Sequence, residues 1–198
     1  MKTFVMLGTI ILFVSCMSGA NRTVDSHLIY FAIVDYERSV EKSIYAGRYD
    51  WANAQVTSVN FPSNESGIKA QSFRLIRIGQ YDILERLVTD QSRQGSRPAT
   101  LKELLAFAEN YPNLQKDYVI VALGSSCKLL ADPDRRNSNR DFSWQTSPPA
   151  TNSMKQFQTF WPFIDSENDM RILDIGQINL KRRYDFRLYV ACFVSAEE

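Results

Sequence analysis

The chain has 198 residues, of which 44% are hydrophobic and 23% are charged, a balance that suits one globular domain with its own core. Its 23 basic residues nearly equal its 22 acidic ones, so the formal net charge is only +1. Nucleic-acid-binding domains usually carry a clear basic excess. The composition therefore gives no indication of a nucleic-acid partner.

The first twenty residues differ from the rest of the chain. Lys2 precedes an apolar run at residues 3–14, and small residues end the segment at Ala20. This order is typical of a secretory signal peptide, and the run is shorter than the roughly 20 residues of a membrane-spanning helix. We expect residues 1–20 to be removed and the protein to be exported, either secreted or at the cell surface. The alternatives are a lipid anchor at Cys16, which would be the protein's only attachment to a membrane, and an unprocessed apolar N-terminus.

The mature chain is expected to begin with a strand and a short helix. Residues 27–34 are apolar and rich in strand formers, which predicts a strand. In residues 36–46, Val40 and Ile44 stand four positions apart among charged residues, and Gly47 follows where a helix C-cap would stand. This pattern predicts a short amphipathic helix.

A loop, a strand and a second helix are expected next. Residues 51–66 include Pro62 and a polar turn, so they predict a loop. Residues 73–78 have strong strand propensity, and Gly79 ends that pattern. The apolar residues of segment 81–90 then recur at helical spacing, which predicts a helix.

The stretch GSRPATLKELL, residues 95–105, carries several helix-start signals. Pro98 biases the preceding residue toward an extended conformation. Thr100 and Glu103 have the spacing of a capping box, in which the hydroxyl accepts from the N3 backbone N–H and the carboxylate accepts from the N-cap N–H. Leucines at helical spacing follow, and Pro112 prevents the helix from continuing.

The remaining sequence predicts a buried strand, a long loop and two closing strands. Residues 118–123 (YVIVAL) are almost continuously apolar, as in a strand buried on both faces. Residues 128–153 are mainly polar, and a loop of this length in a compact domain is usually functional or disordered. Hydrophobic residues return at 157–164, and residues 170–175 and 186–194 are expected to close the fold as strands.

Residue types used in common catalytic and metal sites are scarce. The single histidine, His27, lies beside an apolar strand, and no nucleophile elbow, phosphate-binding loop or dinucleotide fingerprint occurs. A zinc site needs several His or Cys ligands. Cys127 and Cys192 would remain after signal removal, either paired in a disulfide or as buried thiols. We therefore expect no catalytic residue, no metal and no cofactor.

The C-terminal third carries side chains suited to recognition, because aromatic and arginine groups provide large contact areas at low ordering cost. The candidates for ligand binding are Trp144, Trp161, Phe163, Arg171, Asn179, Arg182, Arg183 and Tyr184. For Trp161 and Phe163, a position in the hydrophobic core fits the sequence equally well.

The run GSRPATLKEL at residues 95–104 resembles the G-x-R-x-x-T-x-x-E-[LW] signature of one bacterial branch of C-type-lectin-like domains. This branch includes the formylglycine-generating enzymes and the variable proteins of diversity-generating retroelements. The resemblance implies an α+β fold over residues 56–198, with two or more short helices packed on small antiparallel sheets and with long loops. Residues 21–55 would then form an N-terminal strand and helix extension.

The same resemblance has implications for function. In retroelement-diversified relatives a rigid scaffold holds a variable binding surface, which here would lie between Ser126 and Arg187. Formylglycine-generating relatives bind copper through two cysteines close together in sequence, a pattern that Cys127 and Cys192 do not reproduce. We therefore expect a non-catalytic protein that binds a protein or surface-glycan ligand. The alternatives are a formylglycine-generating-type oxidase or its degenerate descendant, and a structural secreted or envelope protein.

Overall fold

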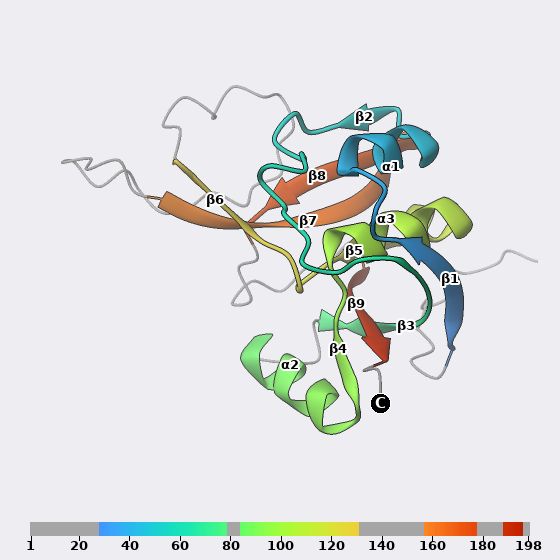
Figure 1. Cartoon of the computed structure of the whole chain (residues 1–198), viewed down its shortest axis with the longest axis vertical. Coiled ribbons are helices and arrows are strands. Elements are labelled where there is room, and N and C mark those ends of the chain that lie inside the picture. The colour runs from blue at the N-terminus through green and yellow to red at the C-terminus, as the bar shows by residue number, and fades with distance from the viewer. Residues whose placement is uncertain (1–27, 79–83, 131–156, 178–187, 196–198) are drawn as a thin grey trace, which may run out of the picture.

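The computed structural model describes residues 28–78, 84–130, 157–177 and 188–195. Over these ranges the fold is α+β, with three α-helices and a mainly antiparallel sheet (Figure 1). The helices are α1 (Val40–Ala46), α2 (Leu84–Arg93) and α3 (Leu101–Asn110), and a short 3-10 helix, η2, follows at Leu114–Lys116. The strands are β1 (Tyr30–Asp35), β2 (Trp51–Ala52), β3 (Ile68–Arg77), β4 (Ser96–Pro98), β5 (Tyr118–Val121), β6 (Cys127–Leu130), β7 (Phe157–Glu167), β8 (Met170–Gly176) and β9 (Leu188–Ser195).

The nine described strands form one connected sheet. Its main order is β1-β3-β9-β5-β7-β8-β2, while β4 pairs with β9 and β6 pairs with β7. Two pairs are parallel, β5 with β9 and β2 with β8, and the others are antiparallel. The last strand, β9, therefore lies inside the sheet, between β3 and β5.

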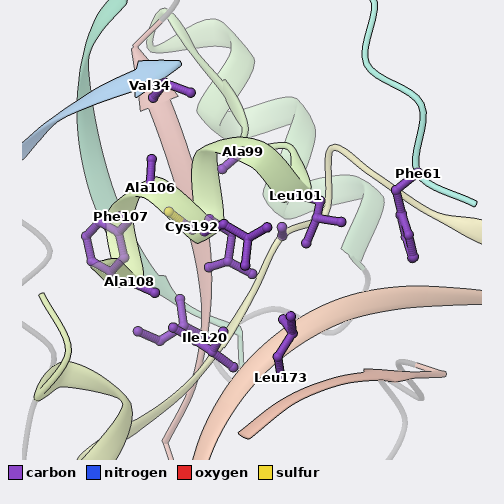
Figure 2. Close-up of a cluster of buried hydrophobic side chains, with 14 of the residues drawn as sticks. Val34, Phe61, Ala99, Leu101, Ala106, Phe107, Ala108, Ile120, Leu173 and Cys192 are labelled. Carbon is purple, nitrogen blue, oxygen red and sulfur yellow. The ribbon is translucent and has the colours of Figure 1, made fainter. Parts of the chain in front are cut away.

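Helices cover both faces of this sheet. Side chains alternate between the faces of a strand, so Cys192 and Val194 of β9 point to one side and Phe193 points to the other. The larger hydrophobic core lies on the first side, beneath α1 and α3. Phe107 and Ile120 are among the residues that fill it (Figure 2). On the second side, Leu87 and Val88 of α2 pack against Phe193 and neighbouring apolar residues.

Most of the predicted elements are confirmed. Residues 27–34 contain most of β1, and the helix predicted over 36–46 is α1, which begins later because Ser39 forms its N-cap and accepts from the N–H of Lys42 at 3.3 Å. The helix of the GSRPATLKELL stretch is α3. β5 is buried as its apolar run predicted, from Val119 to Val121.

Four strands were not predicted, namely β2 and β4, which are short, and β6 and β7. β7 occupies Phe157–Glu167, although it contains Pro162, a residue that usually excludes a central strand. Pro162 is tolerated because the neighbour of β7 changes there from β6 to β5, and its carbonyl still accepts from the N–H of Ala122 at 3.0 Å. The loop predicted from residue 128 also begins too early, since β6 continues to Leu130 through its pairing with β7.

Candidate functional site

A two-stranded ribbon lies at both ends of segment 131–156, which contains the predicted ligand-binding residue Trp144. We call β6 together with Phe157–Phe160 of β7 the β6–β7 ribbon, and it extends away from the helices in Figure 1. At its end Leu130 is directly opposite Phe157, so the segment 131–156 leaves and rejoins the sheet at neighbouring positions. These two apolar side chains are 48% and 64% exposed.

The second segment begins beside the same ribbon. Gly176, the last residue of β8, pairs with Trp161, one position beyond the ribbon. The next residue, Gln177, donates from Nε2 to Oε1 of Gln158 at 2.6 Å. The described residues that flank segments 131–156 and 178–187, Phe157 after the first and Gln177 before the second, therefore lie close together on or beside β7.

The structure describes three of the predicted ligand-binding residues. Trp161 lies half-buried at the base of the β6–β7 ribbon and packs against the core on the α2 side. Phe163 is only 5% exposed and belongs to that same core, so we withdraw it from the binding surface. The other predicted residues, Trp144, Asn179, Arg182, Arg183 and Tyr184, lie outside the described residues.

Arg171 has a structural role that the sequence did not indicate. Its guanidinium donates to the carbonyl oxygens of Gly47 and Ala108, the second at 2.9 Å, and stacks over the ring of Tyr49 with Cζ 4.9 Å from the centroid. Both terminal nitrogens thus join β8 to the ends of α1 and α3. Because these contacts occupy the side chain, the prediction of Arg171 as a ligand contact is also withdrawn.

Cys127 and Cys192 are not joined by a disulfide. Both are buried thiols, Cys127 on β6 and Cys192 on β9. Burial raises the pKa of Cys192, and the negative charge of Glu103 raises it further. A thiol that stays protonated is a poor nucleophile and a poor metal ligand. The structure therefore places the two cysteines as free, buried thiols, the second of the two alternatives.

The signature residues Arg97 and Glu103 form an ion pair in which the carboxylate is fully buried and the Arg97 side chain is partly exposed. Two guanidinium nitrogens of Arg97 donate to the Glu103 carboxylate at 2.9 and 2.6 Å, and Glu103 is fully buried. The backbone N–H of Thr100 donates to the same carboxylate at 2.7 Å, and the hydroxyl of Tyr36 makes a further short hydrogen bond to it. Four donors from three parts of the chain therefore satisfy one buried anion.

The protonation states within this cluster follow from its contacts. Burial by itself would raise the pKa of Glu103, but hydrogen bonds from Arg97, Tyr36 and the Thr100 backbone, with the Arg97 charge, bring that pKa below its ordinary value. Burial and the adjacent Glu103 carboxylate raise the pKa of Tyr36. At neutral pH the cluster therefore holds one buried carboxylate, one guanidinium and one neutral phenol.

The predicted capping box is present, but its two halves differ. The half in which Glu103 accepts from the Thr100 N–H is a short hydrogen bond. The Thr100 hydroxyl faces the N–H of Glu103. That contact does not qualify as a hydrogen bond, and this buried oxygen has no other hydrogen-bond partner among the described residues. The carboxylate is the effective cap of α3.

Sequence reasoning treated Glu103 only as a cap and missed its ion pair with Arg97. The spacing of the two residues in the signature was the available signal, while the contribution of Tyr36 depends on the tertiary fold. Leu130 and Phe157 were also missed as candidates. The signal there was an apolar residue at each end of a polar segment.

Within the described ranges, no group of three or more His, Cys, Asp or Glu side chains could hold a metal ion. None of the helices in these ranges is long and apolar enough to cross a membrane. Comparison of the chain with models of known protein families, with curated proteins and with solved structures found no match.

Proposed function

We propose that this chain is an exported, non-catalytic ligand-binding protein of C-type-lectin-like type. Its ligand would be a protein or a surface glycan, and the binding groups would be carried by segments 131–156 and 178–187 on the base that the β6–β7 ribbon provides. The observation that carries the proposal is that the described residues flanking the two segments, Phe157 for the first and Gln177 for the second, lie on or beside one short stretch of β7, because Gln177 is hydrogen-bonded to Gln158. Binding sites are commonly formed by loops on a rigid scaffold.

Three features support this architecture and function. β3 and β9, the first long strand and the last strand of the expected 56–198 domain, are antiparallel neighbours. The signature residues Arg97 and Glu103 hold α3 against this sheet. Leu130 and Phe157, which flank segment 131–156, are exposed. Exposed apolar groups beside polar ones are typical of recognition surfaces.

The proposal is tested with a hairpin variant, in which a tight turn replaces segment 131–156. Because Leu130 and Phe157 are direct partners, residues 131–156 can be replaced by Asn-Gly, which forms a two-residue turn between paired strands. Both chains would be screened against a glycan array and a library of displayed extracellular protein domains. We expect binding by the parent chain to be lost in the shortened chain, while both melt at similar temperatures. Retained binding would overturn the assignment of the surface and favour a structural protein.

An oxidase of the formylglycine-generating type is disfavoured by the positions of the two thiols. Cys127 and Cys192 are buried on different strands, which do not pair with one another. A copper-dependent oxidase would convert the cysteine of a substrate peptide to an aldehyde. Incubation of the chain with copper and a cysteine-containing peptide, followed by mass spectrometry, is expected to give no such product. Its formation, and its loss in Cys192→Ser, would contradict the non-catalytic assignment.

A further inference from the structure

An apolar face at the edge of the sheet is not covered by any of the three described helices. On β1, Phe31 and Ile33 are 67% and 68% exposed, while the alternate residues Ala32 and Val34 are buried in the core. On β3, Ile68 is 69% exposed, and the register places it near Ile33, across from Asp35. Together with Ala70, which pairs with Ile33, these residues form what we call the β1–β3 face.

This face is larger than the scattered exposure of single apolar residues. Its three large side chains are neighbours on two paired strands, and contiguous patches of this kind on soluble proteins commonly mark interaction sites. α2 covers the same side of the sheet only farther along, at Ile76 and Phe193. The part of this side of the sheet that α2 leaves uncovered is therefore the edge of the sheet, which β1 forms.

The edge of β1 is partly closed to an added strand. The N–H of Phe31 donates to the hydroxyl oxygen of Tyr111 at 3.1 Å, and that hydroxyl donates to the Phe31 carbonyl at 2.8 Å. The main-chain groups of Phe31, which would pair with an added strand near the start of β1, are thus already bonded. A partner would instead pack against the side chains of the β1–β3 face.

The charges at the two ends of this face are opposite. Asp35 continues the outward alternation of Phe31 and Ile33 at one end of β1. Arg74 lies at the other end, on the outward side of β3, because it follows Phe73, the partner of Tyr30. An apolar stripe with a negative end and a positive end is complementary to a copy of itself turned end to end.

We propose that the β1–β3 face is the interface of a two-fold symmetric homodimer. In this dimer the β1–β3 faces of the two copies lie against each other, with their β1 strands running in opposite directions. The two-fold axis lies between the faces and is perpendicular to β1, so Asp35 of each copy lies near Arg74 of the other. An axis parallel to β1 would place like charges together. Isologous contacts of this kind are the commonest in homo-oligomers. Standard interfaces bury about 800 Å² per partner, and an interface of that size extends beyond the apolar stripe. The stripe would form the centre of the interface, and the charged ends would form its rim.

The geometry leaves the proposed ligand surface available in such a dimer. The β1–β3 face lies at one end of the sheet order, whereas the β6–β7 ribbon lies on the far side of β9 and β5. A dimer would therefore present two ribbons, and two linked sites can bind a multivalent surface far more tightly than one. The dimer itself does not depend on the identity of that ligand.

The first experiment measures the molecular mass of the purified chain by sedimentation velocity, up to about 100 μM, where a micromolar dimer is fully formed. We expect a dimer, and we expect Phe31→Thr/Ile33→Thr to raise its dissociation constant by about tenfold or more through loss of buried apolar area. Threonine is a good strand former, so the fold is retained. The matched control is Val59→Thr, which removes an 87% exposed apolar side chain from the turn beside α1 and is expected to change nothing.

The second experiment tests the end-to-end orientation. Asp35→Asn removes the charge but keeps an oxygen for the N–H groups of Glu37 and Arg38, which Oδ1 accepts at 2.9 and 3.2 Å. Arg74→Gln removes the opposite charge. Each is expected to weaken the dimer severalfold, and the double variant is expected to be no weaker than either single one, because both remove the same contact.

Three results would overturn the proposal. One is a chain that stays monomeric over the whole concentration range. Another is a dimer that Phe31→Thr/Ile33→Thr leaves intact. The third is a monomeric chain that sediments with neutral phosphatidylcholine vesicles unless Phe31 and Ile33 are replaced, which would assign the face to a lipid surface. Loss of ligand binding in the hairpin variant would affect none of these outcomes, so the two proposals fail separately.

Discussion

Replacement of Arg97 by methionine measures how much the ion pair with buried Glu103 contributes to the free energy of unfolding. Methionine keeps most of the aliphatic volume and removes the guanidinium that donates twice to Glu103. The carboxylate is 0% exposed and cannot turn to water, whereas the Arg97 side chain is 33% exposed. Removal of one partner from a buried pair typically costs about 3–5 kcal/mol because the other charge is left uncompensated. We expect a loss in this range for Arg97→Met at neutral pH.

The reciprocal substitution is expected to be milder. In Glu103→Gln the amide oxygen can still accept from the Thr100 N–H, and Arg97 can turn its charge toward solvent. The expected loss is about 1–3 kcal/mol, the range for an unsatisfied hydrogen bond. The double variant Arg97→Met/Glu103→Gln should recover part of the Arg97→Met loss, because it leaves no buried charge.

The dependence on pH separates this explanation from a simple packing defect. In the parent chain the Glu103 pKa lies below its ordinary value, so its stabilisation is present above the ordinary carboxyl pKa and is lost as pH falls through the lowered one. Without Arg97, burial should raise the Glu103 pKa, so the variant loses stability as pH rises through that raised value. The difference in unfolding free energy between the two chains should therefore be smaller at about pH 5 than at about pH 7.

Urea unfolding followed by tryptophan fluorescence and circular dichroism at both pH values measures these differences. Coincidence of the two signals would support two-state unfolding, which the free energies require. A loss below about 1 kcal/mol for Arg97→Met at neutral pH would refute the uncompensated-charge argument. An equal loss at both pH values would refute it as well.

Four other outcomes follow from the described contacts. Phe107→Ala should cost about 3–5 kcal/mol in urea unfolding, because the ring is fully buried and packs against Tyr30 of β1 and Phe73 of β3; a loss below 1 kcal/mol would contradict this packing. Gly124→Ala should lower the melting temperature, since the added Cβ would lie 2.8 Å from the carbonyl oxygen of Ala99; an unchanged temperature would show that this turn can shift. Thr100→Ala should cost less than the roughly 1 kcal/mol of a typical N-cap, because the hydroxyl makes no hydrogen bond; a full loss would restore the hydroxyl as the cap. The two buried thiols should resist iodoacetamide until urea unfolds the chain, and intact mass should be the same with and without reductant; a difference of two hydrogens would indicate a disulfide.

Local signals were sufficient where the determinants lie close together in sequence. The helix after Pro98 could be predicted because its capping carboxylate, its leucine stripe and its final proline lie within fifteen residues. β5 could be predicted because a strand buried on both faces requires a continuous apolar run. β7 was missed because Pro162 argues against a strand, and only the change of neighbouring strand at that point makes it acceptable.

The candidate site was less predictable than the scaffold. Phe163 and Arg171 have the residue types of a binding surface, yet one lies in the core and the other joins β8 to two helices. Residue type alone cannot separate these roles, because large aromatic and arginine side chains serve packing and recognition equally well. The ribbon end at Leu130 and Phe157 became visible only through the strand register.

The sequence by itself determined most of the helices and strands of the scaffold, because periodicity, caps and proline stops act within a few residues of one another. The tertiary structure decided what depends on distant partners. It joined Tyr36, Arg97 and Glu103 around one buried charge, kept the two cysteines apart as thiols, and left Phe31 and Ile33 uncovered at the sheet edge. These outcomes follow from which strands become neighbours, and no local pattern specifies that choice.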